Sequence, residues 1–213
     1  PALLEIPGRA HPVTPYFLED ALELAGPPEK KLFSAARKRS NEKPSAFVGL
    51  TTREWAKRPP RHSDHVHAAL SANDPADIDY ELIARLVSAI RAGKVPGYQD
   101  DAAILIFLPG IMEIATMVDK LGNDDSLQVH ALHSALSSTE QSAVFAAPPK
   151  GKRKVVVATN IAETSITIDD VCFVVDCARQ KELRYDADRG LQSLEEVYVS
   201  RAAARQRRGR AGR

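Results

Sequence analysis

The sequence predicts an α/β protein in which a parallel sheet carries helices on both faces. Continuous apolar runs at residues 103–108, 155–157 and 171–175 have the length and composition of buried strands. Helical patterns alternate with these runs across residues 103–175, and such alternation favours parallel strands joined by helices. A β-hairpin is expected after the sheet, followed by a last helix.

Composition and charge place few limits on the function. The 213 residues allow one large domain or two small ones, and 44% hydrophobic with 27% charged residues is ordinary for a soluble globular protein. The net charge of +1 does not indicate a polyanionic partner. Residues 200–213, however, hold six arginines and no acid, and a second basic cluster contains Lys150, Lys152, Arg153 and Lys154. Such clusters can mark phosphate contacts, although most are solvated surfaces.

The two cysteines and the apolar runs bear on the compartment. Cys172 and Cys177 lie on or beside an apolar run and suggest reduced thiols rather than a disulfide framework. No apolar run approaches the roughly 20 residues of a membrane span. The first residues lack the pattern of a secretory signal. We therefore expect an intracellular protein of the nucleus or cytoplasm that has no membrane partner.

The first third of the chain carries weaker structural signals. Residues 3–6 and 13–18 are expected to form strands or extended segments, and residues 19–25 a helix that ends at a Gly-Pro-Pro sequence. From 29 to 75 the periodicity fades and prolines and basic pairs accumulate. Such a segment is typical of an insertion or a mobile linker.

Three histidines fall inside this segment. His62, His65 and His67 have a spacing that can hold a metal ion, but no cysteine and no fourth ligand lies nearby. A structural zinc site normally has four ligands. We therefore expect no metal site.

Residues 77–92 predict a clear amphipathic helix. Its apolar positions recur at helical spacing, Asp77 or Asp79 can cap its start, and Gly93 can close its end. Further along the chain we expect strands at residues 103–108, 128–132, 155–157 and 171–175, helices at 111–121 and 137–146, and a hairpin across 183–197. The helix that begins near residue 137 has overlapping capping boxes, and Ser200 can cap the last helix.

The stretch 155–171 is the strongest candidate for a site. A buried strand passes directly into hydroxyl, amide and carboxylate side chains and ends at Asp169 and Asp170. Ligands of open α/β sheets bind beyond the carboxyl ends of the strands, where this polar stretch begins. The alternative is a loop that only connects two strands, but such loops usually have about 2–6 residues.

Three segments in this order resemble motifs IV, V and VI of the DEAH-box (DEAH/RHA) RNA helicases. They are ILIFLPG at 104–110, ATNIAETSITIDDV at 158–171 and QRRGRAGR at 206–213. Residues 6–20 resemble the passage from the first RecA-like domain of that family into the second. Residues 132–145 resemble the stretch that leads to motif V. The resemblance implies the second RecA-like domain, with the P-loop NTPase type of parallel sheet.

The phosphate-binding residues of this family lie elsewhere. No GxxxxGK[ST] loop and no DEAH tetrad occurs in the sequence. The resemblance implies that a first RecA-like domain supplies both, and that it holds most of the Mg²⁺ coordination for ATP or other NTPs. We therefore expect residues 1–213 to be the second RecA-like domain alone, without the first domain and the C-terminal accessory domains of the family, and to be inactive by itself.

In motif VI the resemblance assigns catalytic roles. Arg210 and Arg213 correspond to the arginine fingers, and Gln206 to the group that addresses the γ-phosphate or its attacking water. An arginine fork suits phosphate oxygens, and the adjacent glycines permit close approach of a backbone or ligand. The alternative for both arginines is a charge on the helix surface. Arg207 receives no definite role, and Arg208 replaces a small residue of many relatives.

In motif V the resemblance assigns two kinds of contact. Thr159 and Asn160 correspond to residues that contact the RNA backbone, for which hydroxyl and amide groups suit sequence-independent binding. Ser165 corresponds to a serine that senses the nucleotide state, and Asp169 to a carboxylate that contacts the nucleotide. Glu163 is equally compatible with a structural role toward backbone N–H groups.

Phe145 corresponds to an aromatic residue that stacks on the nucleotide base. Stacking uses the flat face of the base and so accepts nucleotides other than ATP. The alternative is a buried phenylalanine at the end of an amphipathic helix.

The partners implied are RNA and the other domains of the same polypeptide. The hairpin at 183–197 resembles one that in this family projects toward RNA and separates strands. The long 29–75 segment resembles the branch that includes G-quadruplex-resolving and ribosome-associated helicases, so a structured RNA is one candidate. The alternative function is an RNA-binding scaffold that has kept the fold and lost catalysis.

Overall fold

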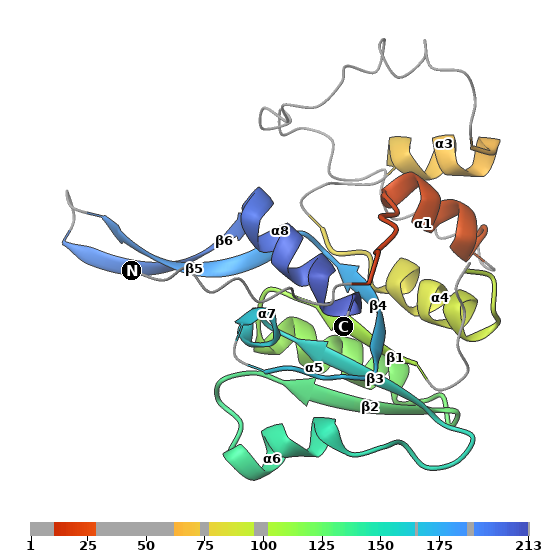
Figure 1. Cartoon of the computed structure of the whole chain (residues 1–213). Coiled ribbons are helices and arrows are strands. Elements are labelled where there is room, and N and C mark those ends of the chain that lie inside the picture. Colours follow the sequence, from red (N-terminus) through yellow and green to blue (C-terminus); the bar gives the residue numbers. More distant parts are fainter. Residues whose placement is uncertain are drawn as a thin grey trace, which may run out of the picture. The chain divides into compact units, whose positions relative to one another are not determined.

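The chain folds as two compact units, one of residues 16–89 and one that combines residues 1–15 with 90–213. The computed structural model describes residues 11–28, 62–72, 77–95, 102–164, 166–186 and 190–212 (Figure 1). The strand expected at residues 3–6 lies outside them. Across the described ranges, no helix is both long and apolar enough to cross a membrane.

The unit of residues 16–89 is helical. It contains α1 (Leu18–Ala25), α3 (Asp64–Ala72) and most of α4 (Tyr80–Arg91). Its core joins Leu22, Val66 and Leu82, one from each helix. The predicted cap of α4 is confirmed, because Asp79 Oδ1 accepts a hydrogen bond from the Leu82 N–H at 2.8 Å.

Helix α3 is a regular element within the segment 29–75, for which the sequence predicted an insertion or a mobile linker. Val66, Ala69 and Leu70 are spaced by three and one residues, and they place one apolar side of the helix against the core of this unit. The start of the helix is held by Glu23, whose Oε2 accepts from the N–H and the hydroxyl of Ser63 at 2.9 and 2.8 Å. These hydrogen bonds lower the pKa of Glu23.

The larger unit is built on a parallel four-stranded sheet in the order β2-β3-β1-β4. The strands are β1 (Ala103–Phe107), β2 (Leu127–Leu132), β3 (Arg153–Ala158) and β4 (Val171–Asp176), so all four predicted strands are confirmed. Strands β1 and β3 lie at the centre, and every residue of both is buried. This explains why their sequences are continuously apolar or nearly so rather than alternating.

Helices cover both faces of this sheet. One face packs Leu105, Phe107 and Val156 against Val144 and Ala162 from the segments that cross it. Helix α5 (Ile111–Leu121) lies behind the sheet in Figure 1 and buries its own apolar stripe of Ile114, Met117 and Leu121. The α/β prediction with helices on both faces is therefore confirmed.

The helix predicted at 137–146 is shorter than expected. Helix α6 (Ser138–Ser142) passes into the 3-10 turn η3 (Ala143–Phe145). Its capping box is confirmed, because Ser137 Oγ accepts from the Glu140 N–H while the Glu140 carboxylate accepts from the Ser137 N–H. The pKa of Glu140 is lowered by the hydrogen bonds from Ser137.

The predicted hairpin and last helix are also present. Strands β5 (Arg179–Asp186) and β6 (Leu191–Tyr198) pair antiparallel and project away from the parallel sheet (Figure 1). Helix α8 (Arg201–Arg208) follows, with Ser200 Oγ accepting from the Ala203 N–H at 3.1 Å, and ends in the turn η4 (Gly209–Ala211).

The basic cluster of residues 150–154 is only partly a solvated surface. Arg153 and Lys154 belong to β3, and both side chains are buried. Arg153 lies over the ring of Phe173, with 5.9 Å between its guanidinium carbon and the ring centroid. Lys150 and Lys152, just before the strand, are exposed. The cluster therefore divides at the point where the strand begins.

Candidate functional site

The candidate site begins at the carboxyl end of β3, in the centre of the sheet. The Thr159 N–H still continues the sheet pattern and donates to the Leu132 carbonyl at 3.1 Å. The chain then turns into the short helix α7 (Ile161–Thr164), where the Glu163 N–H donates to the Asn160 carbonyl at 2.9 Å. Thr159 is half-buried and Asn160 is exposed. Both predicted RNA-contacting side chains thus lie at the strand end that α/β sheets use for ligands.

The remainder of the motif V stretch returns the chain to β4. Asp169 is exposed, whereas Asp170 forms an ion pair with the buried Lys154, with 2.8 Å between Lys154 Nζ and Asp170 Oδ2. Ser165, the expected nucleotide sensor, lies outside the described residues. The two adjacent carboxylates therefore differ in environment: one faces solvent and one closes a charge pair.

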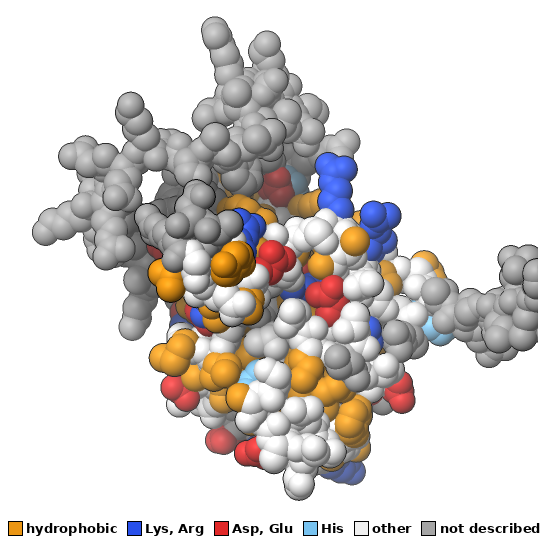
Figure 2. Space-filling model, turned by 90° about the vertical axis from the view of Figure 1, so that its left-hand side faces the viewer, with side chains coloured by type: hydrophobic (Ala, Val, Ile, Leu, Met, Phe, Trp, Pro, Cys, Tyr) orange, Lys and Arg blue, Asp and Glu red, His pale blue; other side chains and the backbone are white. Residues whose placement is uncertain are grey.

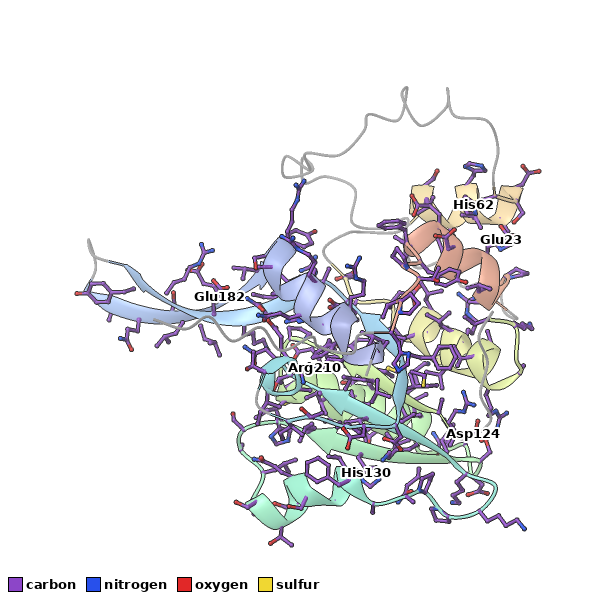
Figure 3. The ribbon with its side chains drawn as sticks, in the orientation of Figure 1. Glu23, His62, Asp124, His130, Glu182 and Arg210 are labelled. Atoms are coloured by element: carbon purple, nitrogen blue, oxygen red, sulfur yellow. The ribbon has the colours of Figure 1, made fainter. Side chains whose placement is uncertain are left out.

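Arg210 of motif VI packs directly on the motif V segment. Its side chain is buried, and its guanidinium donates to the Glu163 carbonyl and, at 3.2 Å, to the Ile166 carbonyl (Figure 3). Gln206 is exposed on α8, and Arg213 lies outside the described residues. The structure thus brings Arg210 to motif V and leaves the Gln206 side chain facing solvent.

Arg207 is the residue that sequence reasoning left without a role. Its side chain is 1% exposed, and its guanidinium donates to Glu163 at 3.1 Å, Asp176 at 2.9 Å and the side-chain oxygen of Gln180 at 3.0 Å. It also lies over the Phe107 ring, 4.9 Å from the centroid. One cation therefore joins α8 to α7, to the end of β4 and to the first residues of the hairpin.

Arg207 shares one face of the last helical segment with two other buried residues. Ala203, Arg207 and Arg210 are the buried positions of this last segment, and they recur at intervals of four and three residues. That spacing marks one face of a helix. The Glu163 carboxylate pairs with the Arg207 side chain, which is a different partner from the backbone N–H groups considered for it.

Phe145 is not a core residue. It is 55% exposed at the end of η3, while the preceding Val144 is completely buried. The alternative of a buried phenylalanine is therefore wrong for this position. Lys154 Nζ donates to the carbonyls of Val144 and Ala146, at 2.9 and 3.2 Å. Hydrogen bonds from a buried side chain therefore fix the turn that carries Phe145.

The hairpin carries more apolar surface than a solvated ribbon needs. Leu183, Tyr185, Leu191, Leu194 and Tyr198 are each more than half exposed. Arg179 pairs with Glu196 at 2.7 Å, and Lys181 with Glu113 at 2.9 Å. Among the described residues on the side from which the hairpin projects, apolar patches lie between scattered charges (Figure 2).

Comparisons with known proteins agree with this arrangement. The family described as "Helicase conserved C-terminal domain" matches residues 82–213. The chain is 37% identical over 260 residues to DHX57 of Mus musculus, covering 99% of this chain and 18% of that protein. It is 36% identical over 236 residues to the ATP-dependent RNA helicase DHX29 of Homo sapiens, covering 99% and 17%.

Solved structures agree as well. The crystal structure of the E. coli DExH-box NTPase HrpB matches with a TM-score of 0.54 and 37% sequence identity, over 65% of this chain and 17% of that one. The chain spans about a fifth or less of the length of these relatives.

A parallel sheet with a polar loop at its carboxyl end, overlaid by an arginine-rich last helix, defines a helicase C-terminal domain of the RecA-like fold, and the chain belongs to that family. Within it, the chain resembles the helicase C-terminal domains of the DEAH-box (DExH) RNA helicases.

Proposed function

We propose that this chain is the second motor lobe of an ATP-dependent RNA helicase and that it couples ATP hydrolysis to RNA unwinding or remodelling. The proposal rests on the packing of Arg210 from motif VI against the carbonyls of motif V. Hydrogen bonds to two backbone carbonyls fix the direction of its guanidinium. Catalysis of phosphoryl transfer depends on such preorganised cations near the developing charge of the γ-phosphate.

In this proposal Arg210 and Arg213 act as the arginine fingers and Gln206 orients the attacking water. The first RecA-like domain supplies the phosphate loop and most of the Mg²⁺ coordination. Phe145 stacks on the base, and Ser165 and Asp169 face the nucleotide. An exposed aromatic ring on a pinned turn supports the stacking role, because stacking needs an accessible flat face.

RNA binds at the opposite end of the same loop. Thr159 and Asn160 contact the sugar-phosphate backbone, which positions the RNA without reading its sequence. One loop therefore carries both kinds of contact. A shift at the nucleotide end displaces the RNA end, which is the type of coupling that discrete loop rearrangements provide.

The test is the steady-state ATPase activity of the full-length protein with RNA. Arg210→Ala and Arg213→Ala should lower kcat by about 10³–10⁵ while changing nucleotide affinity little, because a finger acts mainly on transition-state charge. Arg208→Ala is the matched control, since Arg208 is an exposed arginine of the same helix. A normal kcat with a raised KM would make the two arginines ordinary binding groups and refute their catalytic role.

A further inference from the structure

Lys154 is a charged side chain placed inside the core of the sheet. It lies in the central strand β3 and is 1% exposed. A buried ammonium is costly unless its charge is paired and its hydrogen bonds are made. Both conditions are met here, so the position of Lys154 is set by specific partners rather than by general packing.

The partners of Lys154 match its chemistry one for one. An ammonium has three N–H donors and no acceptor. Nζ contacts three acceptors: the Val144 carbonyl at 2.9 Å, the Ala146 carbonyl at 3.2 Å and Asp170 Oδ2 at 2.8 Å. A neutral side chain of similar length can satisfy none or only part of this set.

Two of these acceptors flank Phe145. The carbonyls of Val144 and Ala146 belong to the residues immediately before and after it, and Val144 is anchored in the core. The third acceptor, Asp170, follows Asp169 at the end of motif V. A single buried atom thus connects the turn that presents an exposed aromatic ring with the loop that presents an exposed carboxylate.

A neighbouring histidine indicates that the charge of Lys154 reaches beyond these partners. His130, labelled in Figure 3, lies in β2. The strand register aligns it with Val156, which is two residues beyond Lys154 and therefore on the same side of β3. Burial and the nearby Lys154 charge lower the pKa of His130.

We propose that Lys154 is a positioning residue that holds Phe145 at a fixed distance from the motif V carboxylates, so that base and phosphates are engaged together. This inference rests on the proposed stacking role of Phe145 and deepens it. Lys154 does not touch the nucleotide. It acts by setting where the stacking ring stands, and its loss therefore weakens binding of the base while leaving binding of the phosphates intact.

The test compares binding of ADP with binding of ribose 5′-diphosphate, which lacks only the base, in the full-length protein. Lys154→Met should weaken ADP binding about tenfold, the lower part of the range for an aromatic stack, and leave ribose 5′-diphosphate binding unchanged. Phe145→Ala should have the same selective effect. In the double variant the ADP loss should not exceed that of Phe145→Ala alone, because the ring through which Lys154 acts is already gone. Lys152→Met is the matched control on an exposed lysine and should bind both ligands normally.

The outcomes separate this inference from the proposed function. The positioning role is overturned if Lys154→Met weakens binding of ADP and of ribose 5′-diphosphate equally. It is also overturned if the losses of ADP binding in Lys154→Met and Phe145→Ala add fully in the double variant. Neither result contradicts the stacking role of Phe145. If Phe145→Ala itself binds ADP normally, the stacking role fails and the inference fails with it. Should Lys154→Met not fold, Asp170→Asn removes the charged partner at a half-exposed position, and selective loss of ADP binding is again required.

Discussion

Arg207 Nε donates to Glu163 Oε2 at 3.1 Å, across 44 residues of sequence. This contact joins the last helix to the short helix that follows the central strand. The same guanidinium reaches Asp176 at 2.9 Å and the Arg179 carbonyl at 3.3 Å, where β4 passes into the hairpin. Motif V, motif VI and the base of the hairpin therefore share one buried cation, and displacement of any of them alters the environment of the other two.

The first prediction concerns stability. Arg207→Met should lower the free energy of unfolding of the chain by about 1–3 kcal/mol, because it leaves two half-buried carboxylates without their cation. Urea unfolding followed by circular dichroism measures this. Arg208→Met, an exposed arginine next in sequence, should stay within about 0.5 kcal/mol of the wild type. Equal effects of the two substitutions would show that the Arg207 network contributes nothing to stability.

The second prediction concerns Gly212. A Cβ atom there would lie 2.7 Å from the His11 carbonyl oxygen and 2.9 Å from Val13 Cγ2, and the His11 N–H donates to the Gly212 carbonyl at 3.0 Å. A backbone atom cannot move aside as a flexible side chain can, so Gly212→Ala should destabilise the chain by about 1–3 kcal/mol. The comparison is thermal unfolding of Gly209→Ala, where an added Cβ meets nothing within 4 Å. That variant should be neutral or slightly stabilised, and a reversed order of the two would contradict the close approach.

The third prediction concerns pH. His130 Nε2 is buried and makes no hydrogen bond within the described part of the chain. Burial, assisted by the charge of Lys154, lowers the pKa of His130 below its ordinary 6.5. As the pH falls, the unfolded chain therefore protonates His130 at a higher pH than the folded chain does. The free energy of unfolding decreases as the pH drops from about 6.5 toward the lower pKa of the folded state.

The measurement is the free energy of unfolding as a function of pH. His130→Gln should flatten the loss of stability below pH 6.5, because the group that protonates on unfolding has been removed. His67→Gln, at an exposed histidine of α3, is the matched control for the chemical change itself. A steeper slope in His130→Gln would reverse the sign of the linkage.

The fourth prediction concerns cysteine reactivity. Burial raises the pKa of the Cys177 thiol to about 11. The thiolate is the nucleophile, so Cys177 should react with iodoacetamide at pH 8 far more slowly than a model thiol. Mass spectrometry locates the adduct, and the urea-unfolded chain supplies the control for full reactivity. Rapid labelling of Cys177 in the folded chain would show that the site opens to solvent.

The strands and the hairpin could be predicted because their signals are local. A buried strand is predicted by the three consecutive residues Val155, Val156 and Val157 alone. The hairpin is predicted by the turn sequence before Leu191. Lys154 and Arg207 could not be predicted in the same way. Each is a basic residue in a basic run, and its burial depends on acceptors that come from distant segments, such as Val144 and Asp170 for Lys154. Local composition carries no record of those acceptors.

The last prediction tests the proposed contact between Asn160 and the RNA backbone. Asn160 is exposed at the end of β3, and its amide is neutral. If it donates to an RNA phosphate, Asn160→Ala in the full-length protein should weaken RNA binding about tenfold for all sequences alike. The dependence of affinity on salt should not change, since only lost cationic contacts alter counterion release.

Asn123→Ala is the control, because that exposed amide lies after α5 and donates to the Asp119 carbonyl at 3.2 Å. Fluorescence anisotropy with two unrelated RNA sequences at several salt concentrations distinguishes the outcomes. Loss for one sequence only would make Asn160 a base-reading residue, and an unchanged affinity would remove it from the RNA interface.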